Sequence, residues 1–261
     1  MSAQQMVFAG QGPIFLGDYD ATLGQAAQGY LVNLKRVGCG NRTLKIGQSR
    51  EKGKVKESCS GQALTLRTWT KGLEATVSLE MVQFSRDEMA IGLYGTSASV
   101  AGSTVTGEIM PTVAVGDYVH TKYPGIASVV IKDSAATPAA LVAGTDYLVD
   151  SAPHGRIQIL NLGAYTQPLA TDYAYATHGR VTAFTGSATR KGLIFDGVNV
   201  AESNAPVRVI IPLIDFDPAK DFNWLSADEA TLTLEGEILF SDALSTDTAW
   251  GPFFKVDALP V

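Results

Sequence analysis

The side chains that most often carry out chemistry are few in this sequence, and they form no known catalytic pattern. Its three histidines are His120, His154 and His178, and the last two precede glycine in turn-like stretches where a solvated imidazole is the simpler explanation. An HExxH helix, a GxSxG turn and a GxxxxGK(S/T) loop are all missing. Gly10-Gln11-Gly12 is half of a dinucleotide-binding motif, without a following helix. We therefore expect a protein that is not an enzyme and needs no cofactor.

Two pairs of aspartates have a spacing that suits a bound cation. Asp18 and Asp20, like Asp215 and Asp217, are one residue apart, so both carboxylates of a pair lie on the same side of an extended strand. Aspartates that form turns explain both pairs more simply. We therefore expect no metal site at either pair.

The charged residues are unevenly distributed along the chain. Ten of the twenty Lys and Arg lie between Lys35 and Lys71, where Glu51 and Glu57 are the only acids. From residue 193 to the end, twelve acids face three bases. The two segments either pair within one fold or lie at opposite ends of a subunit, so that copies attract each other head to tail.

Length and composition indicate a folded protein rich in β-structure. With 261 residues and 46% apolar residues, the chain can build a core in one large domain or two smaller ones. The start has no cationic region followed by an apolar run, so we expect no signal peptide, and no stretch is long enough to cross a membrane. Cys39 and Cys59 lack the spacing of a zinc site; we expect thiols in a reducing cytoplasm, with later pairing left open.

Alternating apolar residues predict strands in the first hundred residues. Residues 64–68 and 75–82 alternate, and Thr70-Lys71-Gly72 between them predicts a hairpin turn. A helix is predicted to begin after Ser85, with Glu88 completing a capping box and Gly95 closing its C-terminus.

The rest of the chain also reads as short strands. Strands predicted at spacings near ten residues between 108 and 182 describe a small inserted sandwich. Residues 193–200, 207–213 and 230–240 are further strands, and the second of these is apolar enough to be buried on both faces. Trp224 is the expected anchor of the turn-rich connection before the last strand. The apolar tail around Phe253 is expected to dock on the body or on a neighbour.

One stretch, residues 47–62, stands out because it is rich in Lys, Arg and Gly and holds only one sizeable apolar side chain, Val55. A solvated surface loop is its simplest explanation. It could also grip phosphates, but it has no aromatic residue to stack on bases, and the net charge of −6 disfavours nucleic acid.

The order of these features resembles the major tail tube protein of long-tailed, siphovirus-type bacteriophages. The resemblance is carried by the opening Val7–Leu16, the linker ending in Glu57–Gln62 and the hairpin after it. The helix from Phe84 to Gly95 and the phrase Gly144–Tyr147 add to it.

The resemblance implies a mainly β fold: a β-sandwich or half-barrel with one flanking α-helix, in two parts at residues 1–107 and 183–261. Residues 108–182 would form a small inserted β-sandwich-like domain that faces outward. Such subunits form hexameric rings that stack into the tail tube through which DNA is ejected. The implied partners are further copies of the chain, a tape measure protein and tail terminator or baseplate proteins, with DNA passing transiently along an acidic lumen and no membrane involved. The implied location is the virion tail, assembled in the host bacterial cytoplasm.

The resemblance also implies an arm, residues 45–62, that reaches the next ring. Its expected contact residues are Arg50, Lys52, Lys54, Lys56 and Glu57. Its expected hinges, which would keep it mobile until assembly, are Gly47, Gly53 and Gly61. The candidate acidic counter-surface is Asp215, Asp217, Asp221, Asp228 and Glu229.

Two other classes of function stay open at this stage. A virion decoration protein or carbohydrate-binding β-sandwich module could use Tyr147, Tyr173 and Tyr175 as a platform. An enzyme would need a titratable cluster that only the fold brings together.

Overall fold

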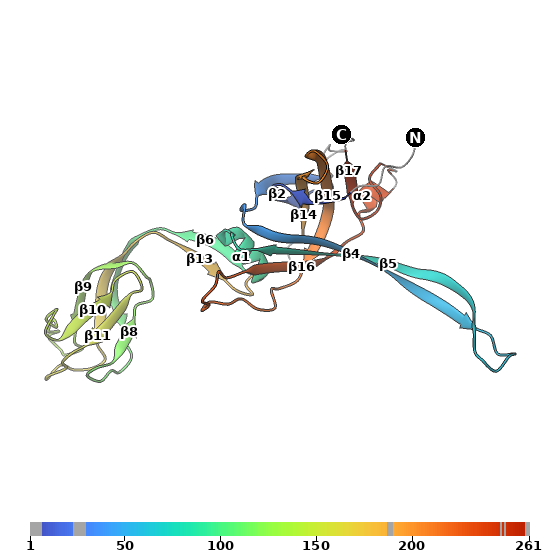
Figure 1. The fold of residues 1–261 in the computed structure, drawn as a ribbon. Helices are drawn as coiled ribbons and strands as arrows, with labels where there is room; N and C mark the ends of the chain where they lie inside the picture. Colours follow the sequence, from blue (N-terminus) through green and yellow to red (C-terminus); the bar gives the residue numbers. More distant parts are fainter. Residues whose placement is uncertain (1–6, 23–29, 187–189, 246, 248, 259–261) are drawn as a thin grey trace. The chain divides into compact units, whose positions relative to one another are not determined.

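A computed structural model describes residues 7–22, 30–186, 190–245, 247 and 249–258 of the chain. It divides into two compact units, Met1–Ser97 with Val181–Val261 (unit 1) and Ala98–Arg180 (unit 2). Both are built mainly from antiparallel strands, as expected, and two short helices lie in unit 1 (Figure 1). Unit 2 covers most of the segment expected as an insertion, residues 108–182, but it begins at Ala98 and ends at Arg180. The reason is that β7 (Ser103–Ile109) pairs with β12 (Ala170–Tyr175) inside unit 2.

Unit 1 is built on one large sheet. Its strand order is β3-β2-β14-β15-β16-β5-β4, with β1 added to β14 and β17 added to β15. The strands are β1 (Gly10–Gln11), β2 (Ile14–Tyr19), β3 (Leu31–Arg36), β4 (Asn41–Lys56), β5 (Thr65–Met81), β14 (Arg190–Asn199), β15 (Ala205–Phe216), β16 (Leu232–Ile238) and β17 (Lys255–Ala258). Strands from both ends of the chain thus meet in one sheet.

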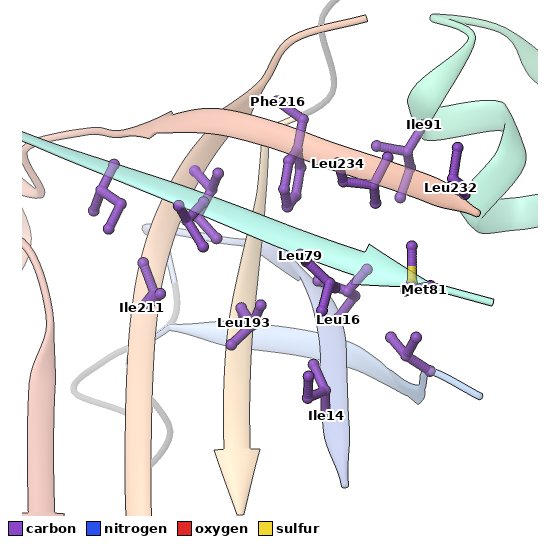
Figure 2. Packing of buried hydrophobic residues seen from close by; sticks show 14 of the residues in the cluster. Ile14, Leu16, Leu79, Met81, Ile91, Leu193, Ile211, Phe216, Leu232 and Leu234 are labelled. Carbon is purple, nitrogen blue, oxygen red and sulfur yellow. The ribbon is translucent and has the colours of Figure 1, made fainter. Parts of the chain in front are cut away.

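The main core of unit 1 lies on one face of this sheet, and Figure 2 shows side chains of β2, β5, β14, β15 and β16 converging there. Leu79, Leu193, Ile211 and Phe216 are fully buried in it. The other face of β14 and β15 is covered as well, because Ile194 packs in a second cluster with Trp250. The prediction that residues 207–213 are buried on both faces is broadly confirmed, since most of β15 from Val207 to Phe216 is buried.

The predicted helix is α1 (Arg86–Gly92), and its capping box is present: the Ser85 N–H donates to the Glu88 carboxylate and the Asp87 N–H donates to the Ser85 hydroxyl. The helix ends as a left-handed turn in which Tyr94, with φ of 47°, takes the position usually held by glycine. Gly95 contributes its N–H, which bonds to Ala90 O at 2.8 Å.

Two local predictions in unit 1 are wrong. Thr70-Lys71-Gly72 is no hairpin turn, because β5 runs through it while pairing with β4. Trp224 is no core anchor, since 74% of it is exposed. Phe222 takes that role, packed against the core and edge-on to Phe84 at 5.6 Å.

The C-terminal segment docks on its own subunit. After α2 (Asp242–Ser245), Phe253 and Phe254 pack against the main core, and β17 pairs with residues 207–210 of β15. Of the two alternatives for the apolar tail, the structure therefore supports docking on the body of its own chain.

Unit 2 is a small two-sheet sandwich. One sheet has the order β10 (Tyr147–Ser151), β11 (Arg156–Ile159) and β8 (Tyr118–His120), and the other has β7, β12 and β9 (Ile126–Lys132). Ile131, Ile157 and Leu169 are fully buried between the sheets. At the boundary of the units, β6 (Thr96–Val100) pairs with β13 (His178–Thr182).

Because the two cores share no residue, we expect the units to unfold independently. Phe216→Ala should destabilise unit 1 by about 3–5 kcal/mol, and Ile157→Ala should destabilise unit 2 by about 2–5 kcal/mol, through lost burial and the cavity that each leaves. Differential scanning calorimetry should show two transitions, each lowered by one substitution only. A single transition that both substitutions lower equally would contradict this.

Candidate functional site: the projecting β4–β5 ribbon

The most unusual feature of unit 1 is that β4 and β5 continue past the rest of the sheet. β16 pairs with β5 only over residues 75–81, whereas β4 and β5 stay paired as far as Lys56 and Thr65. Figure 1 shows this pair extending as a narrow two-stranded ribbon. We call residues 49–74, including the turn at 57–64, the projecting ribbon.

Strand alternation places the basic residues of the ribbon on one face. Arg50, Lys52, Lys54 and Lys56 occupy alternate positions of β4, so their side chains point the same way, about 7 Å apart. Their opposite residues on β5 carry no charge, being Leu73, Thr70, Thr68 and Thr65. Because residues directly opposite each other share a face, the cations have no acid beside them on this face.

All four cations are exposed, and no ion pair joins any of them to an acid within the described part of the chain. The acids of the ribbon are engaged elsewhere. Glu51 binds Lys71 at 3.3 Å, and Glu74 accepts a hydrogen bond from the Ser49 hydroxyl at 3.0 Å. The cationic face, defined by Arg50, Lys52, Lys54 and Lys56, is therefore available to an external anion.

The opposite face of the ribbon carries an aromatic side chain. Trp69 lies directly across from Gly53 and covers it, so that Gly53 is buried although the ribbon is exposed. A Cβ at Gly53 would lie 2.3 Å from Cε2 of Trp69. Glycine at this position is thus required by the close approach of the indole, which fills the gap in the strand.

The turn at the end of the ribbon is organised by Glu57. Its carboxylate accepts hydrogen bonds from the N–H groups of Cys59 at 2.7 Å and Ser60 at 2.9 Å, and from the Ser60 hydroxyl. These bonds lower the pKa of Glu57 to about 2, and the bond from the Ser60 hydroxyl has the largest effect. The turn closes with a bond from the Glu57 N–H to Leu64 O at 2.8 Å.

The expected arm at 45–62 is therefore one strand of a paired ribbon with its turn, rather than a linker between strands. Gly47 and Gly53 are not hinges, because both lie inside β4 and pair with Thr76 and Trp69. Gly61 lies in the turn with φ of 74°, a conformation that favours glycine. Glu57 holds the turn through its hydrogen bonds, so its role differs from that of the other expected contact residues, the four cations of β4.

The expected acidic counter-surface is only partly assembled. Asp217, Asp221 and Asp228 are exposed and have no ion pair among the described residues. Glu229 binds Arg42 of its own chain at 2.8 Å. Asp215 lies within β15, where its Oδ1 is buried without a hydrogen-bond partner, so it does not belong to an exposed surface.

The two cysteines cannot bond to each other within one chain. Both are exposed thiols, and they flank opposite ends of β4, a strand of 16 residues. Such a strand spans about 50 Å, whereas a disulfide needs Cα atoms within about 7 Å.

The aspartates of the first pair, Asp18 and Asp20, make hydrogen bonds within the local structure. Lys191 and Asn33 donate hydrogen bonds to Asp18 and lower its pKa, while the hydroxyl and N–H of Thr22 do the same for Asp20. Within the described ranges, no group of three His, Cys, Asp or Glu side chains is placed to hold a metal ion. None of the helices in the described part of the chain has the length and apolar character needed to cross a membrane.

The expected tyrosine platform of unit 2 does not exist. Tyr147 and Tyr173 are 3% and 2% exposed, and their hydroxyls donate to Val129 O and to Glu108. Tyr175 is half-buried and stacks on Tyr123 with 4.2 Å between ring centres. The phrase Gly144–Tyr147 is likewise structural, because Asp146 is buried and accepts a hydrogen bond from the Val142 N–H at 2.8 Å.

Sequence reasoning missed several exposed apolar side chains near these charges. On the ribbon they are Leu64, Leu66, Trp69 and Leu73, and between β15 and β16 they are Trp224 and Leu225. The alternation of Leu64 and Leu66 with polar residues predicts a strand but does not show that both leucines are exposed. The signal that could have found them is the neighbouring charge, since alternate positions of β4 beyond Arg50 are cationic instead of apolar.

These features define the class of the protein: a mainly β chain with a discontinuous sheet unit, an inserted sandwich and a projecting, cationic two-stranded ribbon. A scan of protein families matches residues 7–257 to the family described as "Protein of unknown function UCP028589". The chain belongs to this family. A search of curated proteins finds no match.

The contact of Trp69 with Gly53 can be tested directly. Gly53→Ala should displace the indole, because the added methyl group occupies its place. Fluorine NMR of protein labelled with 5-fluorotryptophan should show the Trp69 resonance moving toward its position in the unfolded chain. Gly72→Ala is the matched control, since a Cβ there meets no atom within 4 Å. An unmoved Trp69 resonance in Gly53→Ala would refute the contact.

The turn should also depend on pH. Because the pKa of Glu57 is lowered from 4.5 to about 2, the stabilisation of the turn by the carboxylate is fully present above about pH 4.5 and is lost as the pH falls through 2. An NMR titration should place the Glu57 carboxyl midpoint near 2. Glu57→Gln should speed amide exchange at Cys59 and Ser60 at neutral pH, and Glu51→Gln should not. A midpoint near 4.5 would contradict this role.

Proposed function

We propose that the protein is a structural, non-catalytic subunit that assembles with copies of itself, and that it forms the stacked hexameric rings of a bacteriophage tail tube. The observation that carries the proposal is the projecting ribbon, whose cationic face forms no ion pair with an acid among the described residues of its own chain. The resemblance of the sequence to tail tube proteins supplies the particular assembly.

The exposed leucines and like charges of the ribbon support the proposal that it binds a partner. Two-stranded ribbons are marginally stable in water, and this one exposes Leu66 by 70% and Leu73 by 58%. Four like charges on one face also repel each other at a spacing of about 7 Å. A surface that brings acids and apolar contacts would relieve both costs, and a second copy of an acidic chain can provide it.

The free edges of the large sheet support self-assembly as well. β3 pairs only with β2, and β4 pairs only with β5, so each has an unpaired edge in the described part of unit 1. Such edges bind further strands unless they are protected. Neighbouring copies could thus join their sheets laterally within a ring, while the ribbon reaches beyond it.

The rival proposal, a carbohydrate-binding or decoration module, has lost the residues that motivated it. Two of its three tyrosines are buried and hydrogen-bonded inside unit 2. No other observation in the structure favours it over assembly.

Self-assembly should depend on the positive charge of the cationic face. The purified protein should form rings or tubes at high concentration, and the triple substitution Lys52→Glu, Lys54→Glu and Lys56→Glu should raise the required concentration at least about tenfold without unfolding the subunit. Lys54→Glu and Arg67→Glu form a matched pair, because both residues are exposed on the ribbon but Arg67 pairs with Val55 and lies on the other face.

Sedimentation velocity and negative-stain electron microscopy would measure the assembly. A wild-type chain that stays monomeric at every concentration and salt would refute the proposed function. Unchanged assembly of the triple variant would remove the ribbon from the mechanism.

A further inference from the structure

The connection between β15 and β16 holds an exposed surface that complements the ribbon. We call residues 217–231 the acidic turn segment. It contains Asp217, Asp221 and Asp228, none of which forms an ion pair in the described ranges, whereas its one base, Lys220, binds Glu235 at 2.6 Å. Its free charge is therefore negative.

The same segment exposes two large apolar side chains. Trp224 is 74% and Leu225 is 97% exposed. Trp224 is supported by Phe222, whose ring centre lies 4.6 Å from that of Trp224 and which itself packs edge-on against Phe84. The segment thus presents a supported aromatic and a leucine between carboxylates. Aromatic residues of this kind dominate protein interfaces.

The ribbon and the acidic turn segment lie at opposite ends of one strand. β5 has 17 residues, with the ribbon at its Thr65 end. At its other end Met81 pairs with Leu232, the residue that directly follows the acidic turn segment. On β5, the partners of Lys52, Lys54 and Lys56 are Thr70, Thr68 and Thr65, which lie about 35–55 Å along the strand from Met81, so these three cations cannot reach the end of the segment that precedes Leu232 in their own chain.

We infer that the projecting ribbon of one copy docks on the acidic turn segment of a second copy, with Lys52, Lys54 and Lys56 facing Asp217, Asp221 and Asp228, and with Trp224 and Leu225 packing against exposed leucines of the ribbon. This rests on the proposed function and names the partner surface for the ribbon. The contact joins two different surfaces at opposite ends of the subunit, so it repeats head to tail and does not close on itself.

A charge-exchange experiment tests this contact. The ribbon-reversed variant carries Lys52→Glu, Lys54→Glu and Lys56→Glu, and the segment-reversed variant carries Asp217→Lys, Asp221→Lys and Asp228→Lys. In either variant alone, ribbon and segment have the same sign of charge, so each should need at least about a tenfold higher concentration than the wild type to form stacks. In an equimolar mixture each ribbon finds a segment of opposite sign on the other variant, and stacks should form again.

The outcomes separate this inference from the proposed function. If the wild type assembles and the segment-reversed variant assembles equally well, the inference is overturned while self-assembly stands. If both variants fail and their mixture also fails, direct contact between the two surfaces is overturned. A wild type that never assembles refutes the proposed function itself. Circular dichroism should confirm that both variants are folded.

The apolar part of the contact needs its own measurement. Trp224→Ala should raise the concentration for half-assembly by roughly 30-fold, as expected for an aromatic residue at the centre of an interface. Phe184→Ala is the matched control, because Phe184 is 75% exposed in unit 1 but lies outside both surfaces. Equal effects of the two substitutions would overturn the assignment of Trp224.

Discussion

β5 belongs to the core sheet along one half of its length and to a two-stranded ribbon along the other. From Ala75 to Met81, β5 lies between β4 and β16 in the sheet, and its alternate side chains are buried in the main core. This half fixes the direction and the register of the pair, and a slip by one residue would move its buried apolar side chains, such as Leu79, to the solvent face. The ribbon inherits its register from that anchored base. Without it, two strands that bury little apolar surface would not hold together in water.

The ribbon also shows how a chain can expose strands without aggregating. The face of β4 that carries Leu44 and Ile46 into the core continues along the ribbon, but its residues become cationic from Arg50 onward. Lysines on an exposed strand discourage pairing with arbitrary edges, because burying an unpaired ammonium is costly. In the proposed assembly, the same charges bind a partner surface that supplies carboxylates. Protection against wrong partners and attraction to the right one therefore come from the same residues.

Much of unit 1 could be predicted from local sequence, because local interactions decide it. The capping box at Ser85 and the apolar run in β15 are examples. The prediction of a turn at Thr70–Gly72 was wrong because a glycine beside polar residues is also compatible with a strand. In the ribbon this part of β5 stays paired with β4, and Lys71 forms a β-bulge there. Gly53 could not be recognised as a packing site, since its partner Trp69 lies on another strand. The cations were found from charge alone, but their common face depends on register.

The length of β5 keeps the cationic face away from the acidic turn segment of its own chain. Segments of opposite sign could have cancelled within the fold, and one pair does so, since Arg42 binds Glu229. The remaining charges are kept apart, because a paired strand of 17 residues is too stiff and too long to bring its ends together. Screening by salt acts over about 8–10 Å, so the two ends of a subunit do not neutralise each other. In the proposed assembly, a second copy brings Lys54 close to Asp221, a contact that the length of β5 prevents within one chain.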